Sequence, residues 1–409
     1  MPLKPTDPQQ VQEAIAWAAG NRVAIAVQGA GSKSALGRHA PCDEILDLSA
    51  LSGIPFYEPE ELVMTALAGT PLRIVEETLK ASGQEMCFEP ADYGPILGRP
   101  AGSGTIGGVF ACNISGPRRV KSGAARDYLL GAKAVNGRGE FFKCGSRVMK
   151  NVTGYDVCKL LAGSFGTLAA MTEVTFKVLP LPSEIHTVMI LGLTDEQAVV
   201  AMTEALQSPY EVYGAVHLPK SAAARSSIES IRAAGVSITA VRIEGPNPSI
   251  RYCGGHLREM FHGRGALSHL DEPQSQIFWR ELRDVTPFVP LRDRTIWRLS
   301  VTPSKGASVV GEIEKQLDAE AFYDWGGGLI WLAVAEQGPD RAMSDAGIIR
   351  RAAVHAGGHA LLFRAAPDLR ARLPVFQPQS EGAAALSSRL KESFDPQHIL
   401  NPGRMYEGI

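Results

Sequence analysis

The 409-residue sequence contains six cysteines and no C-x-x-C pair. This argues against a zinc ribbon or an iron–sulfur cluster held by this chain alone. His355 and His359 have the i,i+4 spacing of a helical metal pair, but Gly357-Gly358 between them would weaken such a helix, so we predict no metal site. We interpret the cysteines as reduced packing residues: Cys42, Cys87, Cys112, Cys144, Cys158 and Cys253.

Long apolar runs and an excess of basic charge are also missing. No stretch approaches the roughly 18 apolar residues of a membrane span, and the opening MPLKPTDPQQ has no apolar signal-peptide core. Lys and Arg total 41 against 43 for Asp and Glu, so no basic field attracts nucleic acid. We therefore expect a cytoplasmic chain with no transmembrane segment and no nucleic-acid partner.

The first part of the chain mixes helix and strand signals. Asp7-Pro8-Gln9-Gln10 is a capping box with proline at the first helical position, which predicts a helix over residues 8–19. A second helix is expected after Thr70-Pro71, ending near Gly83. Apolar runs predict strands at residues 23–27, 44–49, 62–68 and 167–180, with a hairpin turning at Asn136-Gly137. We expect the first lobe to end at residues 179–182.

The remaining sequence predicts a second lobe. From residue 183 strand-like runs alternate with helical patterns, which indicates an α+β unit to about residue 375. A last helix, over residues 381–395, leads into PQHILNPGRM. At 409 residues the chain is long enough for two domains, so we divide it into residues 1–182, 183–375 and 376–409.

The stretch VAIAVQGAGSKS, residues 23–34, passes from an apolar run into small residues. The dinucleotide fingerprint needs a third glycine where Ser34 stands, and the Walker loop needs a different spacing before its Gly-Lys-Ser/Thr. Small residues would leave the backbone N–H groups of this stretch accessible, and Lys33 would add a positive charge. Together they would form an anion-binding nest for a group such as a diphosphate. The alternative interpretation is an ordinary glycine-rich turn.

Four motifs together resemble a known family: VQGAGSKS, GTIGGVFACNISGPRR…ARDYLLGAKAVNGRGE, GSRVMKNVTGYDVCKLLAGSFGTLAAMTEVTFK and FDPQHILNPGRM. The chain is similar to flavoproteins of the vanillyl-alcohol oxidase and p-cresol methylhydroxylase type, and among them to the FAD-binding E-subunit family of bacterial glycolate oxidase. The resemblance implies an α+β fold: a two-subdomain FAD-binding domain of the p-cresol methylhydroxylase type over residues 1–182, and an α+β cap over 183–375. A C-terminal helix and tail would return to the FAD domain.

The resemblance also implies FAD as cofactor. Lys150-Asn151 and Gly154-Tyr155-Asp156 would open a helix that packs against the flavin, and Arg126-Asp127 is a candidate for a buried pair. The residues implied to hold the cofactor are Gln28, Gly29, Ala30, Gly31, Ser32, Lys33, Gly104, Thr105, Ile106, Gly107, Gly108, Asn113, Ser115, Gly116, Arg126, Asp127, Gly163, Gly166, Thr172 and Val174.

Three positions depart from the family pattern. Ser32 stands where several members carry the histidine that bonds the flavin covalently, so FAD should be non-covalent. Phe165 replaces a glutamate found in catalytic subunits, and residues 324–334 contain no histidine where those subunits carry metal ligands. Because oxidation of a 2-hydroxy acid needs a base and a cation, the catalytic residues stay unknown and we expect the chemistry chiefly in a homologous subunit.

The predicted function is therefore that of an FAD-dependent oxidoreductase acting on CH–OH groups, as a subunit of a glycolate oxidase or dehydrogenase complex. It would relay electrons from a 2-hydroxy acid toward an iron–sulfur F subunit, beside a homologous FAD-binding D subunit, in the cytoplasm or at the inner face of the membrane through these partners. One alternative is a stand-alone FAD-dependent alcohol or 2-hydroxy-acid dehydrogenase that uses cap residues such as Tyr323, Trp325, His217 or Arg298. Another is a flavin-free scaffold, against which the glycine-rich segments argue.

Overall fold

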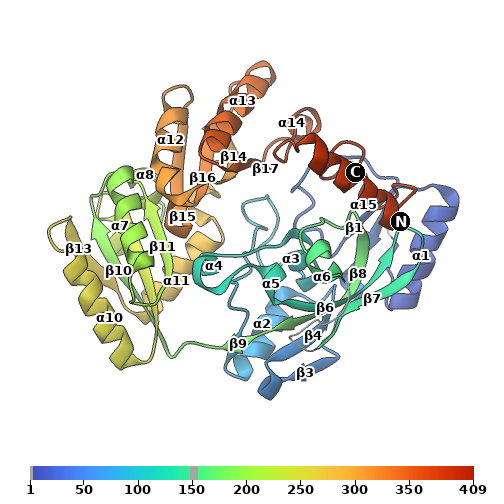
Figure 1. The fold of residues 1–409 in the computed structure, drawn as a ribbon, viewed down its shortest axis with the longest axis horizontal. Coiled ribbons are helices and arrows are strands. Elements are labelled where there is room, and N and C mark those ends of the chain that lie inside the picture. Colours follow the sequence, from blue (N-terminus) through green and yellow to red (C-terminus); the bar gives the residue numbers. More distant parts are fainter. Residues whose placement is uncertain (1–2, 148–154) are drawn as a thin grey trace. The chain divides into compact units, whose positions relative to one another are not determined.

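The computed structural model describes residues 3–147 and 155–409, apart from the side chains of residues 339 and 340. The chain forms two compact units (Figure 1). Unit 1 comprises Met1–Ser115, Ala124–Leu181 and Pro374–Ile409, and unit 2 comprises Gly116–Gly123 and Pro182–Leu373. The first domain predicted from sequence included residues 116–123, which the structure groups with unit 2.

Unit 1 is built on two main sheets. A parallel pair, β1-β2, lies beside a five-stranded antiparallel sheet of order β3-β4-β8-β6-β7, and β5 pairs with β9. Its strands are β1 (Ile25–Gln28), β2 (Glu44–Asp47), β3 (Phe56–Glu58), β4 (Val63–Leu67), β5 (Gln84–Glu85), β6 (Leu129–Asn136), β7 (Phe141–Gly145), β8 (Ala169–Lys177) and β9 (Leu179–Pro180). Its helices are α1 (Pro8–Asn21), α2 (Leu72–Ala81), α3 (Ile106–Cys112), α5 (Ala125–Tyr128), α6 (Val157–Leu161) and α15 (Glu381–Phe394), with short 3-10 turns η1 (Leu48–Ala50) and η2 (Pro59–Glu61).

The predicted start of the first helix is confirmed. The Asp7 side chain accepts a hydrogen bond from the Gln10 N–H at 2.9 Å, and Pro8 occupies the first helical position. Val11, Ile15 and Ala18 are buried on one face of α1 and pack against β1, β2 and the C-terminal tail. The apolar stripe read from the sequence is therefore the face that anchors this helix to the core.

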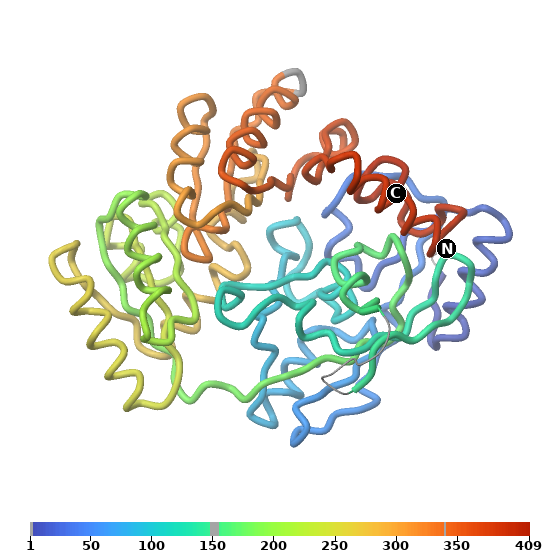
Figure 2. The backbone as a smooth tube through the Cα atoms, viewed as in Figure 1, coloured from blue at the N-terminus to red at the C-terminus, as the bar shows by residue number. Residues whose placement is uncertain are grey.

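The C-terminal segment completes unit 1. Figure 2 shows the chain returning from unit 2 so that its last helix lies near the N-terminal part. Leu400 forms a parallel bridge with Ile25, which extends the small β1-β2 sheet by one step. At the end of α15, the fully buried Lys391 ammonium donates to the Thr167 carbonyl at 2.7 Å, to Asp395 Oδ2 at 2.7 Å and to the Leu400 carbonyl at 2.8 Å. All three donors of Lys391 are thus used to hold the tail in place.

Unit 2 is an α+β unit on one antiparallel sheet of eight strands, in the order β13-β10-β12-β11-β15-β16-β14-β17. The strands are β10 (Glu184–Leu191), β11 (Val212–Leu218), β12 (Ile238–Gly245), β13 (Ala266–Leu270), β14 (Arg294–Ser300), β15 (Ala319–Asp324), β16 (Leu329–Ala335) and β17 (His359–Arg364). The helices are α4 (Arg119–Ser122), α7 (Asp195–Gln207), α8 (Lys220–Ala223), α9 (Glu229–Arg232), α10 (Asn247–Met260), α11 (Glu272–Arg283), α12 (Gly306–Glu314), α13 (Pro339–His355) and α14 (Pro367–Arg372), with turns η3 (Thr286–Phe288), η4 (Pro303–Lys305) and η5 (Trp325–Gly327).

Side-chain alternation separates the two faces of the unit 2 sheet. Val188 and Ile190 of β10 belong to a buried cluster with residues of α7 and α10. Thr187, which points the other way from β10, accepts a hydrogen bond from the Trp279 indole of α11 at 2.9 Å. Helices α7 and α10 therefore cover one face, and α11 lies on the opposite face.

His355 is the last residue of α13 and His359 the first of β17, so the two histidines do not share a helix. Within the described residues, no helix is both long enough and apolar enough to cross a membrane.

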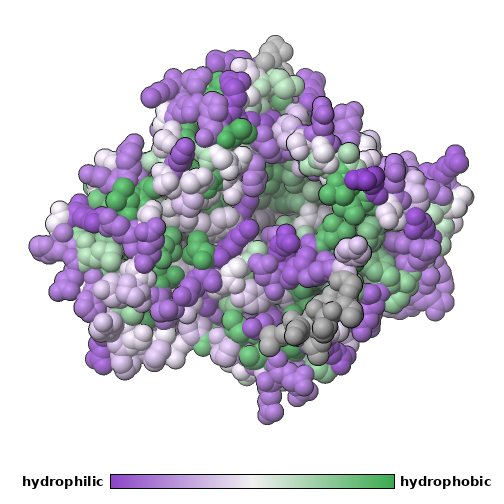
Figure 3. Space-filling view, viewed as in Figure 1, coloured by the Kyte–Doolittle hydropathy of each residue, from purple (hydrophilic) through white to green (hydrophobic). Residues whose placement is uncertain are grey.

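On the face shown in Figure 3, hydrophobic residues form separate patches between hydrophilic ones.

We expect Lys391→Ala to lower the free energy of unfolding by about 3–5 kcal/mol, because it leaves Asp395 as a buried carboxylate without its cation. Thermal and denaturant unfolding followed by circular dichroism would measure this change. Arg389→Ala, at an exposed position of the same helix, is the matched control and should stay within about 0.5 kcal/mol of the unmodified protein. Equal stabilities of the two variants would contradict this role for Lys391.

Candidate functional site

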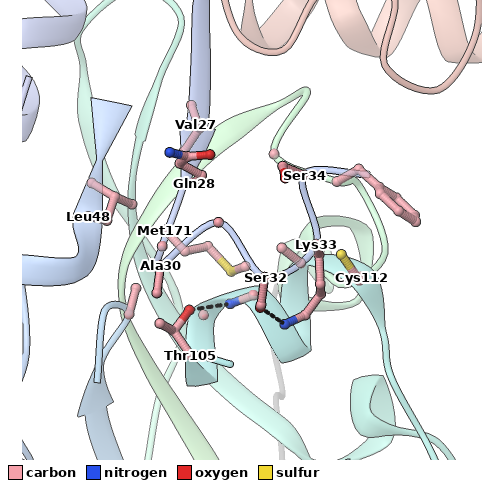
Figure 4. Close-up of a pocket in the computed structure, with 18 of the residues that line it drawn as sticks. Val27, Gln28, Ala30, Ser32, Lys33, Ser34, Leu48, Thr105, Cys112 and Met171 are labelled. Atoms are coloured by element: carbon pink, nitrogen blue, oxygen red, sulfur yellow. Dashed lines mark hydrogen bonds between the residues drawn. The ribbon is translucent and has the colours of Figure 1, made fainter. Parts of the chain in front are cut away.

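A pocket enclosing about 660 Å³, part of it open to solvent, lies within unit 1 between the loop after β1 and the start of α3 (Figure 4). The residues that line it are Val27, Gln28, Gly29, Ala30, Gly31, Ser32, Lys33, Ser34, Leu48, Ala68, Thr105, Gly107, Gly108, Ala111, Cys112, Phe165, Gly166, Ala169, Met171 and Arg404.

The loop of residues 29–33 presents a series of backbone donors. Among the residues that the structure describes, none accepts a hydrogen bond from the five N–H groups of this loop. Gly31 has a φ of +72°, in the region that favours glycine, and Ser34 N–H closes the loop on the Gly31 carbonyl at 3.1 Å. Ser32 and Lys33 are buried, whereas Gly29 and Gly31 are half-buried and Ala30 is exposed, so the N–H groups of this pocket-lining loop are available to a bound anion.

Lys33 adds a positive charge beneath this loop. Its side chain is only 9% exposed, and among the described residues its one hydrogen bond is to Ser32 Oγ at 3.2 Å. Burial lowers the pKa of Lys33, and the charge of Arg404 lowers it further, against the opposing effects of Cys112 and Asp92. An ammonium group has three donors, so Lys33 retains capacity for an anion in the pocket.

Close approach explains two of the glycines. A Cβ at Gly29 would lie 2.3 Å from Thr105 Oγ1, and a Cβ at Gly107 would lie 2.7 Å from both the Cβ and the carbonyl oxygen of Ala68. Thr105 caps α3 by accepting a hydrogen bond from the Gly108 N–H at 3.4 Å. Small residues are therefore needed where the loop, α3 and the end of β4 meet.

The other side of the pocket is apolar and is closed by the C-terminal tail. Met171 and Phe165 supply hydrophobic surface, and Phe165 makes an edge-to-face contact with Phe376 at 5.1 Å between ring centroids. Arg404 donates to the Lys33 carbonyl at 3.1 Å. Asn401 accepts from the Val27 N–H at 3.0 Å and donates to the Phe165 carbonyl at 2.8 Å. The tail thus holds the loop that follows β1 and the turn at Phe165 in place.

The structure brings ten of the sequence-predicted cofactor residues into the lining of this pocket: Gln28, Gly29, Ala30, Gly31, Ser32, Lys33, Thr105, Gly107, Gly108 and Gly166. The other ten lie outside the lining: Gly104, Ile106, Asn113, Ser115, Gly116, Arg126, Asp127, Gly163, Thr172 and Val174. Gly116 belongs to unit 2. Lys150, Asn151 and Gly154, predicted to open a helix beside the flavin, lie outside the described residues.

Several of the residues outside the lining hold the scaffold. Asn113 ends α3 in the left-handed conformation and accepts from the Arg126 N–H at 2.9 Å. Thr172 is fully buried and donates to the Lys133 carbonyl at 3.1 Å. The expectation of a buried Arg126-Asp127 pair is wrong, because both residues are exposed and the Asp127 carboxylate accepts from the Ala124 N–H at 2.9 Å.

Sequence reasoning missed ten lining residues: Val27, Ser34, Leu48, Ala68, Ala111, Cys112, Phe165, Ala169, Met171 and Arg404. Arg404 lies in the NPGRM motif, whose sequence alone does not assign this arginine to the pocket. Most of the others are small or apolar residues that carry no chemical signal of their own. Only the packing of distant segments identifies them.

Two of the cap residues named from sequence belong to a buried network in unit 2. His217 contacts Thr239 Oγ1 at 2.8 Å and Asp195 Oδ1 at 3.2 Å through its two ring nitrogens, and the Tyr323 hydroxyl donates to Asp195. Burial raises the pKa of Tyr323, as does the charge of Asp195. Burial opposes ionisation of Asp195, but the hydrogen bonds from His217 and Tyr323 lower its pKa. Both His217 and Tyr323 are fully buried, so they stabilise the unit 2 core.

Comparison with known proteins identifies the kind of domain that contains this pocket. Residues 2–145 match the family model described as an FAD binding domain. In structure, the chain is similar to 4-ethylphenol oxidase from Gulosibacter chungangensis (TM-score 0.72, 14% identity, 98% of this chain and 88% of that one). It is also similar to p-cresol methylhydroxylase with substrate bound (TM-score 0.71, 15% identity, 99% and 88%). The chain therefore has the fold of p-cresol methylhydroxylase, and its first part matches an FAD-binding domain.

Sequence relatives make the assignment more specific. The chain is 32% identical over 399 residues to the glycolate oxidase subunit GlcE of Escherichia coli (strain K12), with 97% of each protein covered. It is 24% identical over 439 residues to the glycolate oxidase subunit GlcD of Bacillus subtilis (strain 168), covering 99% of this chain and 88% of that protein. The chain belongs to the family of the glycolate oxidase subunit GlcE.

The residues present fit FAD. The five N–H groups of residues 29–33, which have no acceptor among the described residues, and the Lys33 side chain match the two negative charges of a pyrophosphate. The apolar wall at Met171 and Phe165 suits an aromatic ring system. Both features belong to one pocket, which is the arrangement that a dinucleotide with a charged centre and flat rings requires.

We expect Lys33→Met to weaken FAD binding roughly ten- to a hundredfold, because a hydrogen bond to a charged group contributes about 1.5–3 kcal/mol. Titration of the apoprotein with FAD, followed by flavin fluorescence, would measure the dissociation constant. Lys143→Met, at an exposed position on β7, is the control and should bind FAD like the unmodified chain. If Lys33→Met binds as tightly as this control, the ammonium group does not contact the cofactor.

Proposed function

We propose that this chain is the FAD-binding subunit of a glycolate oxidase complex. In this proposal the chain holds a non-covalent FAD. Glycolate, a 2-hydroxy acid, is oxidised to a 2-oxo acid, and the chain relays the released electrons toward an iron–sulfur subunit. The observation that carries the proposal is the loop of residues 29–33, whose five N–H groups have no acceptor in the described part of the chain and which includes the buried Lys33 side chain. FAD supplies the redox chemistry when bound, and the residues of this chain bind it, orient it and exclude water from it.

Non-covalent attachment is supported by the side chains in the pocket. Ser32, at the position where some related flavoproteins carry a histidine, is 6% exposed and accepts a hydrogen bond from Lys33. Cys112 also lines the pocket, and burial raises the pKa of its thiol. The protonated thiol is a poor nucleophile, so neither residue is prepared to bond the flavin.

The proposed partners are a homologous FAD-binding D subunit and an iron–sulfur F subunit. The similarity of this chain to both GlcE and GlcD supports an assembly of two related flavoprotein chains. We assign the iron–sulfur clusters to the F subunit because the six cysteines of this chain form no C-x-x-C pair. The complex would act in the cytoplasm or, through its partners, at the inner face of the cell membrane.

The test is an anaerobic absorbance spectrum of the purified chain before and after addition of glycolate, without and then with the D subunit. We expect the flavin of the isolated chain to stay oxidised, and to bleach once the D subunit is present. Acid precipitation of the same sample should leave the flavin in the supernatant. Rapid bleaching of the isolated chain by glycolate would contradict the relay function.

A second candidate, a stand-alone 2-hydroxy-acid dehydrogenase, is favoured by a basic cluster in unit 2. Arg119 of α4 and Arg298 of β14 lie over the ring of Trp325, with guanidinium carbons 4.6 and 5.0 Å from its centroid. His359 stands on the neighbouring strand β17, opposite Ser300, and its pKa is lowered by burial and by the charges of Arg298 and Arg119. Two guanidinium groups held by one indole are suited to a carboxylate.

If this cluster anchors substrate, Arg298→Met should raise the glycolate concentration needed for half-maximal reduction of the flavin tenfold or more, because the carboxylate loses a charged hydrogen bond. Stopped-flow absorbance at a series of glycolate concentrations would measure this value. Arg258→Met, at an exposed position on α10, is the control. Equal concentration dependence in the two variants would remove the second candidate.

A further inference from the structure

Two thiols of unit 1 lie unusually close together. Cys144 at the end of β7 and Cys158 within α6 have their sulfur atoms 3.1 Å apart. Ordinary non-bonded contacts between heavy atoms lie at roughly 3.5–4.0 Å, and a disulfide bond is about 2 Å long. The pair is therefore closer than packing alone requires and needs about 1 Å of further approach to bond.

The backbone around the pair is shaped to admit the second sulfur. A Cβ at Gly145 would lie 2.9 Å from Cys158 Sγ and 2.0 Å from the Leu130 carbonyl oxygen. The φ of Gly145 is +62°, which favours glycine at this position. Any larger residue next to Cys144 would push α6 away from β7 and separate the sulfurs.

The two thiols differ in character. The Cys158 S–H donates to Cys144 Sγ, and this hydrogen bond lowers the pKa of Cys144. The same interaction, with burial, raises the pKa of Cys158. Cys144 is 8% exposed and Cys158 is 1% exposed. A thiol of lowered pKa that lies 3.1 Å from a thiol of raised pKa is the arrangement of an attacking and a resolving cysteine.

We infer that Cys144 and Cys158 form a reversible disulfide when the protein meets a hydroperoxide such as hydrogen peroxide. The Cys144 thiolate attacks one peroxide oxygen, the O–O bond breaks, and a sulfenic acid forms while the released hydroxide takes up a proton as water. The Cys158 sulfur then attacks the sulfenic sulfur, losing its proton, and the S–O bond breaks to release a second water. Two thiols and one peroxide thus give one disulfide and two waters, with two electrons passed to the peroxide.

The bond would act on the pocket described above. Helix α6 leads directly into the turn whose residues Phe165 and Gly166 line the pocket, and Gly163 N–H in that turn donates to the Phe110 carbonyl of α3 at 3.0 Å. Joining α6 to β7 would fix this wall to the five-stranded sheet. We therefore expect the oxidised protein to release FAD more slowly, an expectation that rests on the proposed FAD site.

The first test uses the full chain treated with a small excess of hydrogen peroxide and digested without reduction. We expect a peptide that joins Cys144 to Cys158, a mass loss of about 2 Da from the two lost hydrogens, and complete reversal by dithiothreitol. Cys144→Ser and Cys158→Ser should each abolish the crosslink, whereas Cys253→Ser, a buried cysteine of unit 2, should keep it. Peptides showing both thiols intact, or oxidised separately to sulfinic acid, would overturn the inference.

The second test compares the rate of FAD release from the oxidised and the reduced protein, by fluorescence after dilution. A slower rate in the oxidised chain, restored by dithiothreitol and absent in Cys158→Ser, supports control of the pocket. Equal rates with the crosslink present would overturn that control while leaving the disulfide established. A chain that binds no FAD still reports on the crosslink, so failure of the proposed function and failure of this inference are distinguishable.

Discussion

Five consecutive backbone N–H groups, those of residues 29–33, have no acceptor among the described residues. The neighbouring parts of unit 1 hold the loop that carries them in this conformation. Several N–H groups that lie along one loop without acceptors form a site at which an anion can accept several hydrogen bonds at once. Strand β1 fixes the start of the loop, and the hydrogen bond from the Ser34 N–H to the Gly31 carbonyl fixes its end. The pocket is thus preorganised for a pyrophosphate before any cofactor arrives.

The C-terminal tail is part of this preorganisation although it is distant in sequence. Asn401 joins β1 to the Phe165 turn, and Arg404 binds the carbonyl of Lys33. The side chains of Lys391 and Asp395 hold the tail through buried hydrogen bonds to the backbone of Leu400. Loss of the tail would therefore loosen the anion loop and the apolar wall together, which couples the stability of unit 1 to cofactor binding.

Much of the fold was predictable because local sequence signals agree with the tertiary structure. The Asp7 cap, the apolar face of α1 and the turn after Asn136 all lie where the sequence indicates. The glycine loop was predictable for the same reason, since only an anion or a tight turn requires those residues. The apolar lining was not, because Leu48 and Met171 look like ordinary core residues until distant strands are assembled. The Cys144 and Cys158 pair was also not predictable, because the two thiols are 14 positions apart in the sequence and only the packing of α6 on β7 brings them together.

The measurement that tests the account most directly is amide hydrogen exchange of the apoprotein and of the FAD-loaded protein, resolved to residues 28–36. Five donors without acceptors should exchange rapidly in the apoprotein and become strongly protected when FAD binds, whereas residues of the unit 2 sheet should change little. Protection confined to these loop amides would establish them as the pyrophosphate site. Full occupancy by FAD with unchanged exchange over residues 29–33 would place the cofactor elsewhere.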